Sequence, residues 1–248
     1  SSSFFDGLRQ NTSIQQLWMN CDEVRTGNVI DRVYNEIMRA YQVNKNLTYF
    51  YMVDYGRTID DADLQQRGGG YEITNTLRSC ISLKDICFDD CGISDEQCIL
   101  IVDAVRGHVA LEVLGLSGQI GNAGCEALAT LLEDPNCNLN KLYVSVIDIR
   151  GTTSIANSLV NNTKLQFLSL HTNPNDRRSA EDVFQILLCN TSSINETYSS
   201  NHILERVCVQ HLGEHFASLL EMNKGTNKSH VAIKKILLHH PNLDMGPL

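Results

Sequence analysis

Apolar residues recur along this chain in a unit that joins a strand pattern to a helix pattern. The clearest unit is LEVLGLSGQIGNAGCEALATLL, residues 111–132. Its first part has the apolar spacing of a short strand, and its second part keeps apolar residues on one face of a helix. Those positions are Leu111, Leu114 and Leu116, then Cys125, Leu128, Leu131 and Leu132. One such unit cannot bury its apolar face alone, so we expect copies on either side.

Seven segments fit the strand pattern L-x-x-L-x-L, at intervals of 26 to 36 residues. The expected strands begin at Ile14, Leu47, Leu83, Leu111, Leu139, Leu165 and Ile194. The last is degenerate, because Thr197 stands where the pattern asks for Leu. Helices are expected between or after the strands, at residues 28–41, 64–77, 95–105, 123–132, 153–160, 179–188, 207–222 and 231–239. The pattern therefore predicts an α/β array of about seven repeats.

Local sequence signals favour the helix at 95–105 and weaken the helix at 64–77. Ser94 is a good N-cap for the helix at 95–105, and Asp95 and Glu96 suit the positive first turn of that helix. The three glycines at 68–70 are expected to break or fray the helix at 64–77.

Three stretches match a known repeat consensus. Residues 165–173 read L-x-x-L-x-L-x-x-N, residues 120–132 read IGNAGCEALATLL, and residues 83–93, LKDICFDDCGI, have Cys at the Asn position. This pattern resembles the leucine-rich repeat family, in its ribonuclease-inhibitor-like class, over roughly residues 12–220. The resemblance implies a curved solenoid, with parallel strands on the concave face and helices on the convex face. Such scaffolds usually bind other proteins.

We expect a single leucine-rich repeat domain over residues 1–225. Within it, residues 1–11 would form an N-terminal cap or the end of a preceding repeat. Residues 226–248 would form a C-terminal capping helix and tail, because the ends of a solenoid need covering. The alternative for this last stretch is that it docks a further domain.

Function is expected on the concave face, where the x positions between the leucines point. The residues predicted to bind a partner are Trp18, Tyr49, Tyr51, Asp85, Asp89, Glu112, Tyr143, Phe167, His171 and Tyr198. Aromatic side chains anchor protein interfaces, and the carboxylates between them suit a basic protein or peptide. The alternative is that the rings pack on one another and only cover the sheet.

Composition restricts the partner and the compartment. The formal net charge is −9, so the chain lacks the positive footprint that nucleic acid or anionic membrane requires. No apolar run approaches the roughly 20 residues that span a bilayer. A cytoplasmic location is expected, and secreted and organellar locations stay open. The nine cysteines form no paired C-x-x-C arrangement, so we expect buried, reduced thiols rather than a disulfide framework.

Six N-x-S/T triplets have two interpretations. They begin at Asn11, Asn46, Asn161, Asn190, Asn195 and Asn227. They could be glycosylation acceptors of a secreted protein. We favour the alternative, in which four of these asparagines end the preceding helix in the left-handed conformation, just before a strand.

Catalytic patterns are weak, and no catalytic, cofactor or metal-binding residue is predicted. His211, Glu214 and His215 match the H-x-x-E-H pattern of a zinc protease, but the repeat explains them as the outer helix of its last unit. Gly118, Gly121 and Gly124 are expected in a strand-to-helix turn.

Three functions from different classes follow. The preferred one is a non-enzymatic protein-interaction module that binds a protein or peptide on its concave aromatic and acidic face. The alternative is a structural subunit of a larger assembly, which would use the solenoid ends or the convex surface while the concave face stays idle. The third is a zinc hydrolase.

Overall fold

Strands and helices alternate from β2 to α8. The computed structural model describes residues 2–20, 36–37, 39–40, 42–43, 45–53, 69–146, 149–171, 177–209 and 214–242. The elements in order are α1 (Ser2–Gln10), β1 (Gln16–Asn20), β2 (Tyr49–Val53), α4 (Gly69–Ser79), β3 (Asp85–Ile93), α5 (Asp95–Val105), β4 (Val113–Ile120), α6 (Asn122–Glu133), β5 (Lys141–Val146), α7 (Ile149–Ser158), β6 (Phe167–His171), α8 (Arg177–Leu188), α9 (Ile194–Ser199), β7 (Arg206–Val209), α10 (Glu214–Asn223) and α11 (Lys228–His239).

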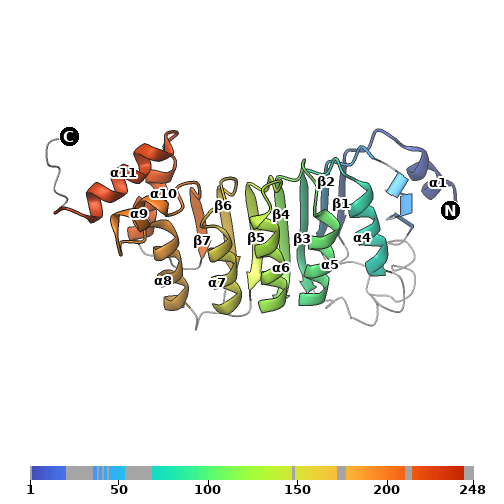
Figure 1. Ribbon diagram of the computed structural model, residues 1–248. Coiled ribbons are helices and arrows are strands. Elements are labelled where there is room, and N and C mark those ends of the chain that lie inside the picture. The colour runs from blue at the N-terminus through green and yellow to red at the C-terminus, as the bar shows by residue number, and fades with distance from the viewer. Residues whose placement is uncertain are drawn as a thin grey trace.

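The seven strands form one parallel sheet whose spatial order is the order of the sequence, β1 to β7. Helices α4 to α8 stand in a row along one face of this sheet, as Figure 1 shows. We call the opposite sheet face, which these helices do not cover, the concave face. A parallel sheet in sequence order with helices on one side confirms the predicted leucine-rich repeat solenoid.

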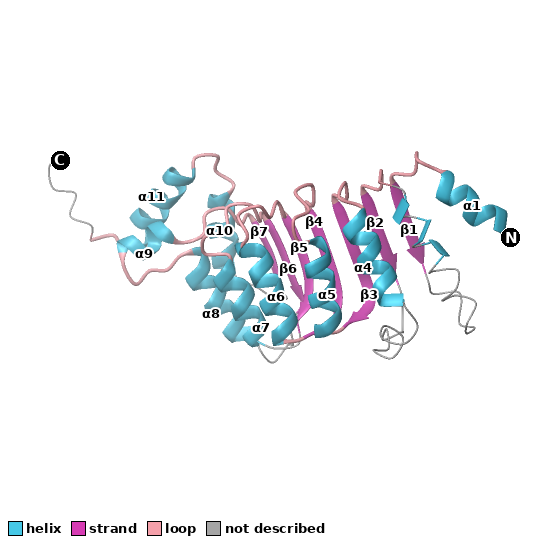
Figure 2. Ribbon diagram, turned by 45° about the vertical axis from the view of Figure 1, so that its right-hand side comes forward, coloured by secondary structure: helices cyan, strands magenta, loops and turns pink. Residues whose placement is uncertain are grey.

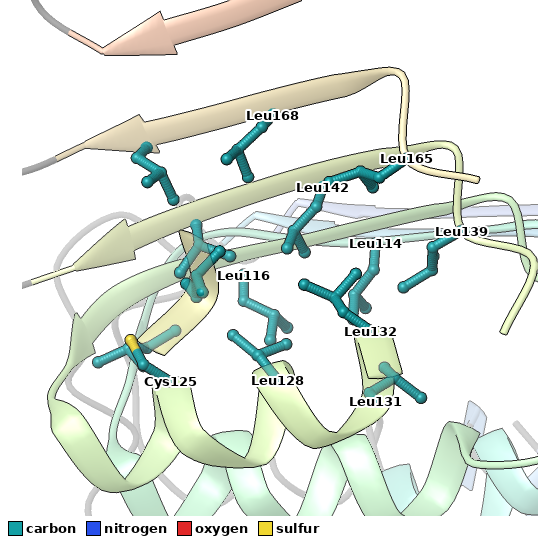
Figure 3. Packing of buried hydrophobic residues seen from close by; sticks show 14 of the residues in the cluster. Leu114, Leu116, Cys125, Leu128, Leu131, Leu132, Leu139, Leu142, Leu165 and Leu168 are labelled. Carbon is teal, nitrogen blue, oxygen red and sulfur yellow. The ribbon is translucent and has the colours of Figure 1, made fainter. Parts of the chain in front are cut away.

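The core consists of three rows of side chains that stack from strand to strand on the helix side of the sheet. All of them are less than a tenth exposed. The first row is Leu47, Leu83, Leu111, Leu139, Leu165 and Leu204; the second is Phe50, Ile86, Leu114, Leu142, Leu168 and Val207; the third is Met52, Phe88, Leu116, Val144, Leu170 and Val209. Figure 3 shows Cys125, Leu128 and Leu132 of α6 packing toward these rows. The helices thus cover rows that no strand could bury alone.

The predicted strand at Ile194 is wrong. Ile194–Ser199 is the short helix α9, because the Ser193 side chain accepts a hydrogen bond from the backbone N–H of Glu196 and caps a first turn. The seventh strand is Arg206–Val209, so the expected helix at 207–222 begins only at Glu214. The other six predicted strands are confirmed, and so is the cap at Ser94, which forms a complete capping box with Gln97.

Asparagine side chains join neighbouring repeats where each helix turns into a strand. The Asn162 Nδ2 donates to the Leu132 carbonyl of the preceding repeat at 2.8 Å, and its Oδ1 accepts from the Leu165 N–H at 2.8 Å. Asn201 repeats this with the Leu159 carbonyl at 2.7 Å and the Leu204 N–H at 2.8 Å. The expectation of left-handed asparagines is wrong, because among the described non-glycine residues Asp90 is the one with positive φ.

Three glycines from the end of β4 to the start of α6 allow close approach of the previous repeat: Gly118 lies in β4, Gly121 in the turn and Gly124 in the first turn of α6, which corrects the expectation that all three lie in the turn. The Asp95 Oδ1 accepts from the backbone N–H groups of Gly121 at 2.7 Å and Gly124 at 2.9 Å. A Cβ atom on Gly121 would lie 2.8 Å from the Asp95 Oδ2, and one on Gly118 would lie 2.1 Å from the Ile93 nitrogen. Close packing of consecutive repeats therefore accounts for all three glycines.

At the C-terminal end, α11 packs against α9 and α10 beyond the edge of the sheet, as Figure 2 shows. Its Lys235 is fully buried, and the Nζ donates to the carbonyls of Leu188 at 2.6 Å and Asn201 at 3.2 Å. This lysine holds α11 against the last repeats. Within the described ranges, no helix has the length and apolar character needed to cross a membrane.

The adjacent asparagines at 161 and 162 offer a matched test of the hydrogen bonds by which Asn162 and Asn201 join neighbouring repeats, which we call the asparagine ladder. Asn162→Ala should lower the free energy of unfolding by about 2–3 kcal/mol, because it leaves the buried Leu132 carbonyl and the Leu165 N–H without partners. Asn161→Ala, at an exposed position, should change it by less than about 0.5 kcal/mol. Urea denaturation measures both, and equal effects would contradict the asparagine ladder.

Stability should depend on pH through Lys235. Burial lowers the pKa of this lysine from 10.5 to about 8. Between these values the unfolded chain holds a proton that the folded chain has released, so the contribution of Lys235 to stability rises with pH. The free energy of unfolding of the native protein, relative to that of Lys235→Met, should therefore rise by roughly 1–3 kcal/mol between pH 7 and pH 10.5. Chemical denaturation of both proteins across this range measures the difference, which would stay constant if Lys235 did not titrate in this window.

Candidate partner-binding face

Nine of the ten residues predicted to bind a partner lie on or beside the concave face. Trp18 is on β1, Tyr49 and Tyr51 on β2, Asp85 and Asp89 on β3, Glu112 just before β4, Tyr143 on β5, and Phe167 and His171 on β6. Parallel pairing in register aligns the central position of every strand in one row: Trp18, Tyr51, Cys87, Gly115, Tyr143, Ser169 and Cys208. The row has large side chains at β1, β2 and β5 and small ones at β3, β4, β6 and β7, which gives the face its relief.

Aromatic rings gather in two clusters on this face. In the first, the Trp18 and Tyr51 rings lie 4.4 Å apart between centroids, and Tyr49 stacks on Tyr51 at 6.4 Å. In the second, the Tyr143 and Phe167 rings lie 5.0 Å apart. The rings do pack on one another, yet Trp18 remains 67% exposed and Tyr143 40% exposed. The clusters therefore keep aromatic surface available for a partner.

A hollow of about 500 Å³ lies between the two clusters. Tyr49 and Tyr51 line one side and Tyr143 lines the other. The small residues Cys87 and Gly115, on the two strands between these walls, form its floor. A Cβ atom at Gly115 would lie 2.7 Å from the Cys87 Sγ, so the floor is already tightly packed.

Carboxylates make the hollow electronegative. Asp85, Asp89 and Asp90 line it, and the Tyr51 hydroxyl donates to the Asp89 Oδ2 at 2.8 Å. Burial raises the pKa of Asp85, the nearby Lys141 lowers it and Glu112 raises it. Burial also raises the pKa of Tyr143, and the Asp85 charge adds to that effect. Burial, the largest cause of both shifts, disfavours charge of either sign, so it is the carboxylates lining the hollow that favour a cationic group there.

Tyr198 does not belong to this face, which corrects its prediction. It lies on α9 and is 53% exposed, because the segment that contains it is helical. Its place in the row is taken by Cys208 of β7, and Arg206 occupies the neighbouring position. The Arg206 guanidinium lies over the Phe167 ring, 5.7 Å from its centroid. Since Arg206 is basic, the face is acidic toward β3 and basic toward β7.

Sequence reasoning passed over Arg206 although a signal for it exists. Residues 204–209 read LERVCV, which fits L-x-x-L-x-L with valine at the last two leucine positions. Nothing in the sequence indicates that Gly115 and Cys87 form the floor of a hollow.

The H-x-x-E-H pattern falls on side chains that the structure does not describe. His211 lies outside the described residues, as do the side chains of Glu214 and His215. In the part of the chain that the structure describes, no group of three or more His, Cys, Asp or Glu side chains is arranged to hold a metal ion.

The chain is similar to known leucine-rich repeat proteins over part of its length. No family model matches it. It is 35% identical over 104 residues to NACHT, LRR and PYD domains-containing protein 5 of Mus musculus, covering 40% of this chain and 9% of that protein. It is 30% identical over 118 residues to the ribonuclease inhibitor of Mus musculus, covering 46% of this chain and 26% of that protein. The chain thus spans about a tenth and a quarter of these relatives.

A solved structure, the tropomodulin C-terminal domain of Caenorhabditis elegans, covers 97% of the chain at 10% identity and a TM-score of 0.31, a likeness too weak to define a fold. The repeat pattern, the parallel sheet in sequence order and the two relatives confirm the resemblance to the leucine-rich repeat family in its ribonuclease-inhibitor-like class.

Thiol reactivity tests the geometry of the hollow. Burial and the neighbouring Asp89 and Asp85 charges raise the pKa of Cys87 to about 12, whereas Cys208 is exposed on the same row. Because the thiolate is the reacting form, iodoacetamide at pH 8 should modify Cys87 about 100-fold more slowly than Cys208. Mass spectrometry of the peptides measures both rates. Similar rates in the folded protein would contradict this geometry, and the difference should disappear in denaturant.

Proposed function

We propose that this protein is a non-enzymatic interaction module that binds a protein or peptide on its concave face. The observation that best supports this function is the hollow between two partly exposed aromatic clusters, with carboxylates along its sides. Exposed aromatic side chains beside a recess are typical of the residues that dominate binding energy at protein interfaces.

The charge of the face suggests the kind of partner. The acidic part at Asp85, Asp89 and Asp90 complements basic groups, and the rings on either side complement apolar groups. One of the relatives is named for inhibiting ribonuclease, which is itself a protein, and this agrees with a protein as ligand.

Removing one ring from each aromatic cluster tests the proposal. Trp18→Ala/Tyr143→Ala should weaken binding of the partner by about 2 kcal/mol or more, roughly 30-fold, if these rings anchor the interface. Both side chains are well exposed, so the thermal unfolding temperature should change little. The measurement is an affinity pull-down from native extract with bound proteins identified by mass, followed by titration of the purified partner.

Ile186→Ala is the matched control. Ile186 is 60% exposed, similar to Trp18, but lies on helix α8 on the opposite face of the sheet. It should retain the partner. A loss below about 0.5 kcal/mol in the double variant would remove the concave face as the binding site.

A further inference from the structure

Helix α11 is apolar on two sides. One side is buried against the preceding helices through Val231, Ala232 and Ile236. The other exposes Ile233 at 46%, Leu237 at 52% and Leu238 at 55%. A helix that is apolar on both sides is normally covered on both.

The exposed side forms a continuous stripe with positive charge. Positions 230, 233, 234, 237 and 238 recur at helical spacing and are all exposed, which places His230 and Lys234 beside the three apolar residues. The sequence of α11, KSHVAIKKILLH, has three lysines and no carboxylate. By comparison, α5 and α8 expose one large apolar residue each, Leu100 and Ile186. We call residues 230, 233, 234, 237 and 238 the outer stripe.

The hollow on the concave face is complementary in shape and charge to the side chains of this stripe. Its two walls stand on β2 and β5, three strand spacings apart, or about 14 Å at roughly 4.8 Å per strand. A helix with its side chains is about 10–12 Å across. The floor between the walls is built from small residues, Cys87 and Gly115, and Asp85 and Asp89 supply negative charge. Because this distance of about 14 Å separates the strand backbones and the rings take up part of that width, the side chains along one face of a helix, rather than a whole helix, would enter between the rings.

We propose that α11 of one copy of this protein docks in the hollow of a second copy. The apolar residues of the outer stripe would pack between the Tyr51 and Tyr143 rings, and Lys234 would pair with the carboxylates of β3. This inference rests on the proposed function of the concave face and names its partner as a second copy of the same chain. It follows the mode in which a helix lies in a groove.

Such a contact is head-to-tail. Figure 1 shows α11 beyond β7 at the C-terminal end of the array, whereas the hollow lies over β2 to β5 in its middle. Each copy thus offers two different surfaces, and a contact of this kind adds copies one after another unless a ring closes.

The test uses purified protein and two variants, each of which removes one surface. Leu237→Glu places a charge in the outer stripe and leaves the hollow intact. Tyr143→Lys removes one wall of the hollow, repels Lys234 and leaves α11 intact. Ile186→Glu, at a similarly exposed position on α8, is the control. Analytical ultracentrifugation over a range of micromolar concentrations gives the masses, and circular dichroism verifies that each variant is folded.

The mass of the native protein and of Ile186→Glu should increase with concentration beyond the 27.7 kDa of the monomer. Leu237→Glu and Tyr143→Lys, each measured alone, should stay monomeric. An equimolar mixture of the two variants should form a dimer of twice that mass and no larger species, because only one intact pair of surfaces remains. High salt should weaken the growth of the native protein, because Lys234 meets carboxylates.

The proposal fails if the native protein is monomeric at every concentration. It also fails if Tyr143→Lys still grows, since α11 would then contact some other surface, or if the mixture stays monomeric. Leu237-dependent binding of a monomeric protein to phosphatidylserine vesicles would assign the stripe to a membrane surface and overturn the proposal. If the native protein is monomeric while a different partner is lost in Trp18→Ala/Tyr143→Ala, the proposed function stands and only this inference falls.

Discussion

Burial of the three stacked rows of apolar side chains is the constraint on which the rest of this structure depends. A single strand and helix leave these rows open on both sides, so each repeat is stable only between neighbours. Stacking requires the strands to lie in register and in sequence order, as they do from β1 to β7. The details between repeats serve the same close approach: Asn162 and Asn201 satisfy backbone groups of two repeats at once, and Asp95 lies against the glycines of the next turn.

The concave face is a consequence of this stacking. Because side chains alternate along a strand, whatever places leucines on the helix side also lines up the residues between them on the other side. Pairing in register then places residues that are 26 to 39 positions apart in the sequence next to one another, such as Trp18 beside Tyr51. Relief on the face comes from the sizes of residues in one row, with tyrosine at two strands and a small residue or glycine at the two strands between them.

The repeat pattern predicted most of the fold because the signal recurs. Six strands and the membership of nine residues in the concave face follow from period-two alternation and the L-x-x-L-x-L spacing. The cap at Ser94 follows from the residue type at the start of a helix. The seventh repeat was misplaced because two segments competed for it. Ile194 begins a weak match that a capped helix turn overrides, and Leu204 begins a match that uses valines.

Other features depend on side-chain conformations that spacing does not encode. The hydrogen bond from Tyr51 to Asp89 and the hollow between the ring clusters are of this kind, and so is the burial of Lys235 within a helix whose next lysine, Lys234, is exposed. Asn162, and not its neighbour Asn161, makes the hydrogen bond to the preceding repeat. Which of two adjacent residues does so depends on where the helix ends to within one residue, and sequence predicts element boundaries least well.

The distance between the two aromatic walls is set in whole strands. Duplication of the repeat that contains β4 would keep every row of the core and move the Tyr51 and Tyr143 walls apart by one further spacing, about 4.8 Å; deletion of that repeat would bring them together by the same amount. The width available to a ligand can therefore change only in steps, through gain or loss of a repeat, while its chemistry can change continuously through single substitutions at the positions that face it. An array of this kind separates the evolution of the size of its binding site from the evolution of its charge.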